Sequence, residues 1–317
     1  MLAPKLEAVS TTIRTRMESE HAPRIPEVSA HLVEAGGKRL RPLLTLAAAD
    51  LCGYRGENDV KLAATVEFIH TATLLHDDVV DGSEKRRGRP SANILWDNKT
   101  SVLVGDYLFA RAFKLMVEVG SLRILDILSE AAAVIAEGEV LQLTTAQNLA
   151  TDEPTYLKVI RGKTAALFAA ATEVGGVIAD AGEAEVQALR IYGDALGISF
   201  QIADDLLDYD GSSAALGKNT GDDFREGKIT MPILLAVAQA DAEERQFWAR
   251  VIESGRQEEA DLDRALAILT RHGALEATRQ KALFWSERAR EALDVFPDSA
   301  MRQRLDALVD YVVGRIA

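Results

Sequence analysis

Apolar residues recur at steps of three and four along almost the whole chain. In residues 57–80, for example, one stripe contains Leu62, Val66, Ile69, Thr73 and Asp77. This is the spacing of one face of a helix. Residues that favour helices, such as Ala, Leu, Glu, Gln and Arg, are abundant, and strand-like alternation is nearly absent. The pattern therefore predicts an all-α protein.

Several helix boundaries can be predicted from capping residues. Asp152-Glu-Pro154 is typical of a helix start with Asp152 as N-cap, and Phe296-Pro-Asp-Ser is expected to open the last helix. Gly211-Ser-Ser is expected to end another. Residues 100–149 are largely apolar and lack proline, which predicts one long central helix. We expect about a dozen helices without a flexible linker, and hence a single all-helical domain over residues 1–317.

Composition narrows the function. The net charge of −13 argues against nucleic acid as a partner, because phosphate backbones require a basic surface. The single cysteine, Cys52, excludes an internal disulfide and fits a reducing compartment, and we expect it to be a buried apolar side chain. No apolar run is long enough for a membrane span, and the N-terminal residues lack a secretory apolar core. A cytoplasmic protein without a membrane span is expected.

Two acidic motifs lie far apart in the chain. One is Leu-Leu-His-Asp-Asp-Val-Val-Asp at residues 74–81, and the other is Ala-Asp-Asp-Leu-Leu-Asp-Tyr at residues 203–209. Positions four apart share one helix face, so each motif forms a carboxylate pair. The pairs are Asp77 with Asp81 and Asp204 with Asp208, whereas the middle members Asp78 and Asp205 point about 100° away.

Each pair needs a cation nearby. Carboxylates one turn apart repel each other, and the macrodipole disfavours them near a helix C-terminus. Mg²⁺ fits, because it takes one or two carboxylates and completes its shell with water and substrate phosphates. A solvated acidic helix end is the alternative, but the motif occurs twice, each time after an apolar helix and before basic residues. Calcium in an EF-hand is excluded by the missing loop spacing, central Gly and terminal Glu.

Basic clusters accompany both motifs and predict a diphosphate ligand, since Arg and Lys bind phosphate oxygens. They are Gly-Gly-Lys38-Arg39-Leu-Arg41-Pro, Arg86-Arg87 directly after the first motif, and Arg161-Gly-Lys163-Thr164. The polar segment 217–228, with Lys218, Asp222, Asp223 and Lys228, is interpreted as a mobile lid over the phosphates. His70, two turns before Asp77, is either a packing residue or a donor to phosphate, and His76 is interpreted as structural.

These segments, in this order and from Gly36 to about Pro232, resemble the trans-isoprenyl diphosphate synthases, or polyprenyl synthetases. The resemblance also rests on Gly-Asp-Tyr-Leu-Phe-Ala-Arg-Ala, Gly-Lys-Thr-Ala-Ala-Leu-Phe and Gly-Lys-Asn-Thr-Gly-Asp-Asp. It implies an isoprenoid-synthase helical bundle with a central elongated cavity, which forms a homodimer. The implied reaction is the head-to-tail condensation of isopentenyl diphosphate with an allylic diphosphate, for which farnesyl diphosphate is the expected primer.

The resemblance also implies roles for individual residues. Asp77, Asp81 and Asp204 would hold about three Mg²⁺ ions, with Asp78, Asp205 and Asp208 in support. Contacts to the allylic diphosphate would come from Arg86, Lys163, Thr164, Gln201 and Lys218, and contacts to isopentenyl diphosphate from Lys38, Arg41, His70 and Arg87. Asp77, Asp81, Asp204, Lys163 and Arg86 would be the catalytic set.

Chain length in this family depends on the side chains beneath the first acidic motif. Ala72 and Thr73 stand there and are small, which predicts a long product; Phe113, Met116 and Val119 are candidates for a deeper floor. The local sequence looks most like that of octaprenyl diphosphate synthases, and decaprenyl diphosphate synthases are the second choice. The resemblance implies that the product becomes the side chain of ubiquinone. The alternatives are a shorter-chain, geranylgeranyl-type synthase, a class I terpene cyclase, a non-catalytic synthase subunit and a Mg²⁺-dependent hydrolase.

Overall fold

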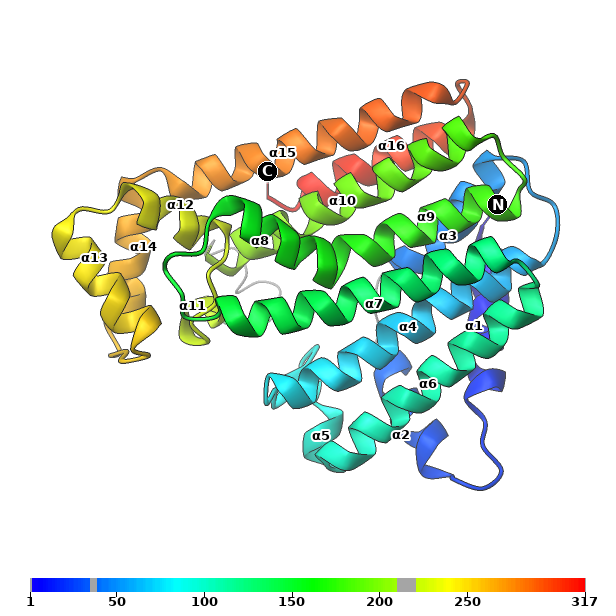
Figure 1. Cartoon of the computed structure of the whole chain (residues 1–317), viewed down its shortest axis with the longest axis horizontal. Helices are drawn as coiled ribbons and strands as arrows, with labels where there is room; N and C mark the ends of the chain where they lie inside the picture. The colour runs from blue at the N-terminus through cyan, green and yellow to red at the C-terminus, as the bar shows by residue number, and fades with distance from the viewer. Residues whose placement is uncertain (1, 35–38, 210–220, 317) are drawn as a thin grey trace. The chain divides into compact units, whose positions relative to one another are not determined.

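The protein is almost entirely helical in the residues that the computed structural model describes, which are 2–34, 39–209 and 221–316 (Figure 1). Within these ranges the only strands form a short antiparallel hairpin of β1 (Lys85–Arg86) and β2 (Arg89–Pro90). The prediction of an all-α fold is confirmed. None of the described helices has the length and apolarity needed to cross a membrane.

The chain divides into two compact units, which are described separately. The first consists of Met1–Ala132 and Leu167–Arg190, and the second of Ala133–Ala166 and Ile191–Ala317. The long helices α7 (Leu122–Thr145) and α10 (Glu183–Tyr209) each contribute residues to both. A single domain over residues 1–317 stays a prediction, as does the central elongated cavity.

The first unit is built around α4, with its remaining elements drawn in blue to green in Figure 1. Besides the hairpin and parts of α7 and α10, its elements are α1 (Ala3–Met17), α2 (Arg24–Glu34), α3 (Leu40–Leu51), α4 (Asn58–Val80), α5 (Ala92–Leu95), α6 (Asn98–Val119) and α9 (Ala166–Ile178).

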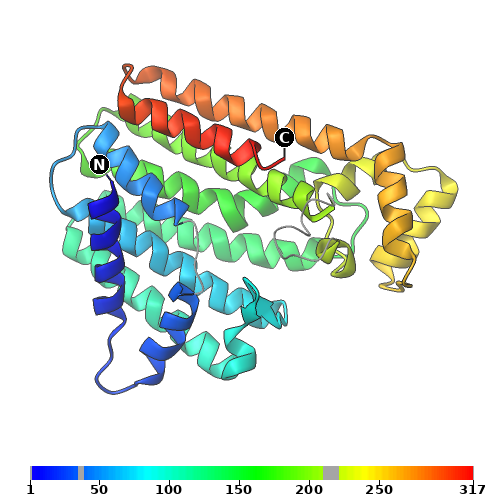
Figure 2. The same cartoon turned by 180° about the vertical axis from the view of Figure 1, so that it is seen from behind.

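Helix α4 is buried along most of its length and on all sides. It packs against α1, α3 and α6, and α1 can be followed across α4 in Figure 2. Leu62, Phe68, Ile69 and Leu75 are at most 1% exposed. Burying each such side chain stabilises the fold by about 1.5–3 kcal/mol. An apolar surface on all faces is typical of a central helix.

The predicted single helix over residues 100–149 is wrong. The structure has two helices there, because α6 ends at Gly120 and α7 begins at Leu122. Gly120 adopts φ 80°, a left-handed conformation that favours glycine at a helix end. The hydroxyl of Ser121 then accepts a hydrogen bond from the backbone N–H of Ile124, in the first turn of α7. The Gly-Ser pair was the sequence signal for this break.

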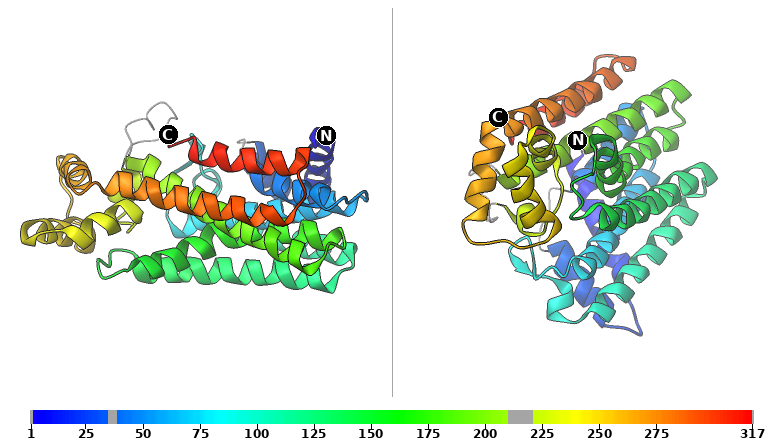
Figure 3. Two further views of the ribbon diagram at one scale, coloured as in Figure 1. Left: turned by 90° about the horizontal axis from the view of Figure 1, so that it is seen from above. Right: turned by 60° about the vertical axis from the view of Figure 1, so that its left-hand side comes forward.

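The second unit ends in a pair of long helices. Besides parts of α7 and α10, its elements are α8 (Glu153–Ile160), a π-helical turn (Arg161–Ala165), α11 (Asp222–Arg225), α12 (Met231–Gln239), α13 (Ala242–Trp248), a second π-helical turn (Ala249–Glu253), α14 (Asp261–Arg271), α15 (Ala274–Ala292), a 3₁₀ turn (Leu293–Val295) and α16 (Ala300–Val313). Helices α15 and α16 pack side by side, as Figure 3 shows.

The predicted helix starts in this unit are confirmed. Asp152 caps α8 by accepting a hydrogen bond from the backbone N–H of Thr155, and Ser299 caps α16 in the same way through Arg302. The prediction of a loop over residues 217–228 is wrong in part, because residues 222–225 form α11. The remainder of the expected lid, and the helix end expected at Gly211, lie largely outside the described residues.

Candidate active site

The first aspartate motif ends α4. Asp81 is the C-cap, and its backbone N–H donates to the carbonyl of Asp77 over 2.8 Å. Asp77 is half-buried and Asp81 is exposed. The expected helical spacing of this pair is therefore present, at the end of an apolar helix.

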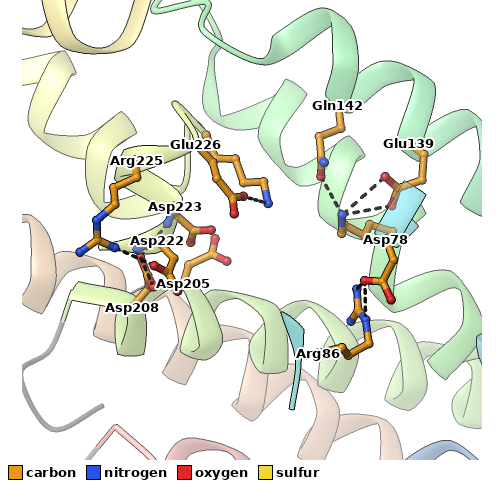
Figure 4. A network of polar contacts seen from close by, with 12 residues as sticks. Asp78, Arg86, Glu139, Gln142, Asp205, Asp208, Asp222, Asp223, Arg225 and Glu226 are labelled. Atoms are coloured by element: carbon orange, nitrogen blue, oxygen red, sulfur yellow. Dashed lines mark hydrogen bonds and ion pairs between the residues drawn. The ribbon is translucent and has the colours of Figure 1, made fainter. Parts of the chain in front are cut away.

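Asp78, the middle residue of the motif, points into the protein and binds Arg86. Its side chain is fully buried, and Oδ1 accepts a 2.7 Å hydrogen bond from the Arg86 guanidinium (Figure 4). Oδ2 is buried and has no hydrogen-bond partner among the described residues. Arg86 remains 26% exposed, so the same side chain can hold Asp78 and face solvent with its other N–H groups.

The hairpin after the motif places Arg87 in a tight turn. Arg87 and Gly88 connect β1 to β2 with φ values of 53° and 76°. Two positive φ values are the signature of a type I′ turn, in which the first position favours Asn or Gly over Arg. Non-glycine residues in this conformation are uncommon and tend to be retained where function requires them.

Arg87 lines a small cavity of about 20 Å³ in the first unit, together with Arg39, Glu67 and His70. Next to it, Nη1 of Arg41 lies 3.2 Å from Nε2 of His70. Burial and the neighbouring Arg41 hold the pKa of His70 well below its usual value, so the imidazole is neutral and accepts this bond. Two arginines and a neutral imidazole line the cavity, and Arg41 lies beside it, so the positive charge favours an anion here.

Glu67 is a member of this cluster that the sequence analysis missed. It stands three residues before His70 on α4 and lines the same cavity. Burial raises its pKa, whereas Arg41, Arg39 and Arg87 act in the opposite direction. The i, i+3 spacing to His70 was the available signal, because it puts both side chains on one face.

The second aspartate motif lies in the last turns of α10. Asp205 is buried and both of its oxygens accept hydrogen bonds, from the Tyr156 hydroxyl at 2.6 Å and from Nε2 of Gln201 at 2.8 Å. Burial raises the pKa of Asp205 to about 6, and these two bonds counteract the rise. Asp205 is therefore held by protein donors, and its supporting role at a metal site stays a prediction.

Asp208 serves as a cap for α11. Its Oδ1 and Oδ2 accept hydrogen bonds from the backbone N–H groups of Asp222 and Asp223, at 3.2 and 3.0 Å (Figure 4). A carboxylate at a helix N-terminus is favourable. Asp223 itself is crowded by acids: burial, followed by Asp205 and Asp208, raises its pKa well above the usual value. Such crowding by like charges favours a nearby cation.

Asp204, the first residue of the second motif, contacts Arg315 near the C-terminus. Arg315 donates to its Oδ1 over 3.0 Å and lies over the ring of Phe200, 5.0 Å from the centroid. The side chain of Asp204 remains 32% exposed. The sequence analysis missed Arg315, since 111 positions separate it from Asp204 and no motif surrounds it.

Lys163 and Thr164 are presented by the π-helical turn between α8 and α9. The ammonium of Lys163 lies 3.2 Å from oxygens of Glu139 and Gln142 on α7. Thr164 donates to Oε1 of Gln201 over 2.8 Å. The structure thus brings Lys163, Thr164 and Gln201, three predicted phosphate contacts, into the same unit as the second motif.

Close backbone contact fixes this turn against α7. A Cβ on Gly138 would meet Cα of Gly162 at 2.8 Å and the backbone N of Lys163 at 2.9 Å. Only glycine fits at either position without a shift of the backbones. Single π-helical turns of this kind occur frequently at functional sites.

Two predicted phosphate contacts, Lys38 and Lys218, lie outside the described residues. The prediction for His76 as a structural residue agrees with its environment: Nε2 is 3.1 Å from the carbonyl of Val102, and the ring packs on Gly105.

The acidic motifs suit Mg²⁺ in their donor chemistry. Within the described ranges no three His, Cys, Asp or Glu side chains gather as a complete metal cluster. Mg²⁺ does not need one, because it takes hard oxygen donors and leaves several positions to water and phosphate. The buried Oδ2 of Asp78 and the acid crowding around Asp223 both favour a cation. The residues present therefore fit the ion.

The predicted chain-length residues lie in the core of the first unit. Ala72 is fully buried, and Thr73 is half-buried with its hydroxyl donating to the carbonyl of His70. Of the deeper candidates, Met116 is buried, but Phe113 is 43% exposed and points to the surface of this chain.

Comparisons with known proteins find close similarity to one family of enzymes. A model of the polyprenyl synthetase family matches residues 22–269. An octaprenyl diphosphate synthase from Haemophilus influenzae is 42% identical over 312 residues, which cover 98% of this chain and 94% of the relative. A crystal structure of a decaprenyl diphosphate synthase from Rhodobacter capsulatus has 68% identity and a TM-score of 0.97, covering 100% of this chain and 97% of that one. A polyprenyl synthase from Caulobacter crescentus, complexed with calcium and isoprenyl diphosphate, has 52% identity and a TM-score of 0.95, covering 100% and 96%.

Proposed function

The chain belongs to the polyprenyl synthetase family and is a long-chain trans-polyprenyl diphosphate synthase, and we propose that it extends farnesyl diphosphate with isopentenyl diphosphate. The observation that supports this most is that each aspartate-bearing helix end comes with its own group of phosphate-binding side chains. Arg86 and the Arg41–His70 cluster accompany the first, and the Lys163 turn accompanies the second.

The metal proposal assigns direct ligands and supporting residues. Asp77, Asp81 and Asp204 are the proposed Mg²⁺ ligands, with Asp78, Asp205 and Asp208 in support. Bound Mg²⁺ would neutralise the charge that builds on the departing diphosphate. The complex of the Caulobacter relative with calcium and an isoprenyl diphosphate supports a divalent cation in this role. About three ions in the substrate complex stays a prediction.

The allylic diphosphate is proposed to bind Lys163, Thr164, Gln201, Arg86 and Lys218. Their N–H groups would donate to the phosphate oxygens as the carbon–oxygen bond breaks, which is electrostatic stabilisation without a protein nucleophile. The hydroxyl hydrogen of Thr164 is donated to Gln201, so Thr164 would contact the Mg²⁺–diphosphate complex through its oxygen. In the structure the ammonium of Lys163 binds Glu139 and Gln142. Lys163 must give up part of these contacts in order to bind the phosphate.

Isopentenyl diphosphate is proposed to bind Lys38, Arg41, His70 and Arg87. The neutral imidazole of His70 can turn its other ring N–H toward the phosphate while it accepts from Arg41. The double bond of the bound molecule attacks the allylic cation, and the proton that is then lost passes to the released pyrophosphate. Products of eight isoprene units are the prediction, and the decaprenyl relative makes ten the nearest competitor.

A homodimer is proposed from an exposed apolar stripe on α6. Leu103, Phe113 and Val117 are 66%, 43% and 68% exposed and lie on one face of that helix. Large apolar side chains grouped in this way mark interaction surfaces. The exposure of Phe113 is explained if it belongs to this surface. A cytoplasmic location stays a prediction.

One experiment separates the proposed function from its alternatives. The protein is incubated with radiolabelled isopentenyl diphosphate, farnesyl diphosphate and Mg²⁺, and the dephosphorylated products are sized by chromatography. Chains well beyond four isoprene units support the proposal, and arrest at geranylgeranyl would indicate the shorter-chain synthase. Cyclised hydrocarbon would indicate a terpene cyclase, free farnesol a hydrolase, and no reaction a non-catalytic subunit.

A further inference from the structure

A chain of hydrogen bonds links the phosphate-binding turn to the second aspartate motif. Thr164 Oγ1 donates to Oε1 of Gln201 over 2.8 Å, and Nε2 of Gln201 donates to Oδ1 of Asp205 over 2.8 Å. The other oxygen of Asp205 accepts from the hydroxyl of Tyr156 over 2.6 Å. The three hydrogen bonds therefore run from Thr164 to Gln201 to Asp205 on one side, and from Tyr156 to Asp205 on the other.

Of the four residues joined by these hydrogen bonds, Tyr156 is the one that belongs to no phosphate or metal motif. It lies on α8, seven residues before Lys163, and is 3% exposed. Its ring belongs to an apolar cluster with Ile160, Ile202 and Leu206. Its hydroxyl is the polar tip of an otherwise apolar anchor, and the bond to Asp205 satisfies it.

The position of the Asp205 carboxylate depends on this hydroxyl. Side-chain donors on two helices, Tyr156 of α8 and Gln201 of α10, bind its two oxygens, and the backbone of Met231 supplies a further hydrogen bond. Asp205 is the direct neighbour of Asp204, and Gln201 is one turn earlier on the same helix. Without the hydroxyl, the carboxylate is held only by Gln201 and the Met231 backbone, so the Gln201 amide and its bond from the Thr164 hydroxyl are fixed less firmly.

We propose that Tyr156 is a positioning residue of the synthase, which acts through Asp205 and Gln201 to hold the metal-binding end of α10 and the Thr164 hydroxyl in register for the Mg²⁺–diphosphate complex. The inference rests on the proposed function, because it assigns that complex to the second motif and the π-helical turn. Tyr156 itself touches neither the metal nor the diphosphate in this arrangement.

The decisive variant is Tyr156→Phe, which removes the hydroxyl alone. Tyr192→Phe is the matched control: Tyr192 is also buried, lies on α10, and its hydroxyl donates to the carbonyl of Leu305 over 2.8 Å, away from the motif. The first readout is the rise in melting temperature caused by inorganic pyrophosphate as Mg²⁺ is titrated, which requires no turnover. Ligands that bind the folded state raise this temperature.

Tyr156→Phe should raise the Mg²⁺ concentration for half of the maximal shift about tenfold, since a hydrogen bond to a charged group contributes that much. Tyr192→Phe should lower the starting melting temperature but leave the half-maximal concentration unchanged. In turnover assays Tyr156→Phe should lower kcat and leave KM for isopentenyl diphosphate unchanged, because Arg41, His70 and Arg87 are intact. Half-maximal concentrations within twofold of each other for the two variants would overturn the proposal.

A double-mutant cycle tests whether Tyr156 acts through Asp205. In an Asp205→Ala background, Tyr156→Phe should change the Mg²⁺ dependence by less than twofold; additive effects would show that Tyr156 contributes only packing. If Tyr156→Phe folds poorly, Gln201→Met breaks the other bond to Asp205 and should shift the Mg²⁺ dependence in the same direction. If the wild-type protein does not elongate the prenyl chain, the proposed function is refuted. The pyrophosphate titration would still decide the role of Tyr156, because it requires no turnover.

Discussion

At the scale of single residues, the site contains buried groups whose protonation and pairing are set by neighbours from distant parts of the chain. His70 is buried beside Arg41, and Asp78 is buried against Arg86. Each arrangement has a consequence for stability that can be measured without substrate.

His70→Gln should reduce the acid sensitivity of the fold. Burial and Arg41 depress the pKa of His70, so below about pH 6.5 the unfolded chain binds a proton that the folded chain does not. The free energy of unfolding therefore falls as the pH is lowered from about 7 to 5. Urea unfolding across this range should show a shallower fall in His70→Gln, because glutamine can accept from Arg41 without titrating. The exposed His21, replaced by Gln, is the control, and equal slopes for the two variants would contradict the assignment.

Arg86→Met should destabilise the fold by about 2 kcal/mol or more, because it leaves the Asp78 carboxylate buried without its guanidinium. Urea denaturation measures the loss. Arg89→Met, on the exposed strand of the same hairpin, should cost less than about 0.5 kcal/mol. Adding Asp78→Asn to Arg86→Met should recover part of the loss, and failure to recover any would mean that the pair is not the cause.

At the scale of elements, the π-helical turn between α8 and α9 is placed by the contact of two glycines. Gly138 of α7 and Gly162 of the turn approach so closely that neither can carry a side chain without a shift. This contact also decides which α7 residues, Glu139 and Gln142, face Lys163.

Gly138→Ala should therefore weaken both stability and substrate binding. The added methyl group must push the backbone of Gly162 and Lys163 away, which costs about 1–3 kcal/mol. The displaced Lys163 should raise KM for the allylic diphosphate more than KM for isopentenyl diphosphate. Gly182→Ala is the control, because its Cβ would meet only Glu185 Oε2 at 3.4 Å. Equal changes in both KM values would contradict the role of the turn.

At the scale of the whole molecule, we expect α4 to limit the length of the product, and we place the surface of the proposed homodimer on α6. Ala72 is buried in the middle of α4, and the exposed stripe lies on α6.

Ala72→Phe should shorten the product to about four isoprene units or fewer, because the ring would close the path one turn below Asp77. Chromatography of the dephosphorylated products measures this. Ala63→Phe is the control for overpacking, since Ala63 is equally buried but lies on the opposite side of α4. Full-length products from Ala72→Phe would show that the chain does not grow past this residue.

Phe113→Asp should dissociate the proposed homodimer, because it buries a charge in an apolar interface. Size-exclusion chromatography with light scattering measures the mass of the particle in solution. Glu118→Gln, a change on the same helix outside the apolar stripe, should leave the mass unchanged. A wild-type mass of one chain would refute the homodimer itself.

Local sequence determined the helices, most of their caps and the residues of the two acidic motifs. These features depend on side chains within one or two turns of each other, so periodicity and spacing suffice to find them. The helix break at Gly120 was also visible locally but was outweighed by the apolar pattern on both sides. The family and its activity followed from motif order, which a single sequence contains in full.

Only the tertiary structure revealed Glu67 in the arginine cavity, Arg315 on Asp204 and Tyr156 on Asp205. The last two contacts join residues 111 and 49 positions apart, and the partners have no shared local pattern. A tyrosine on an apolar helix face is ordinarily a core residue, and sequence alone gives no reason to separate Tyr156 from Tyr192. The difference arises because burial forces each hydroxyl to find an acceptor, and the packing of the helices decides whether that acceptor is a backbone carbonyl or a carboxylate of the second aspartate motif.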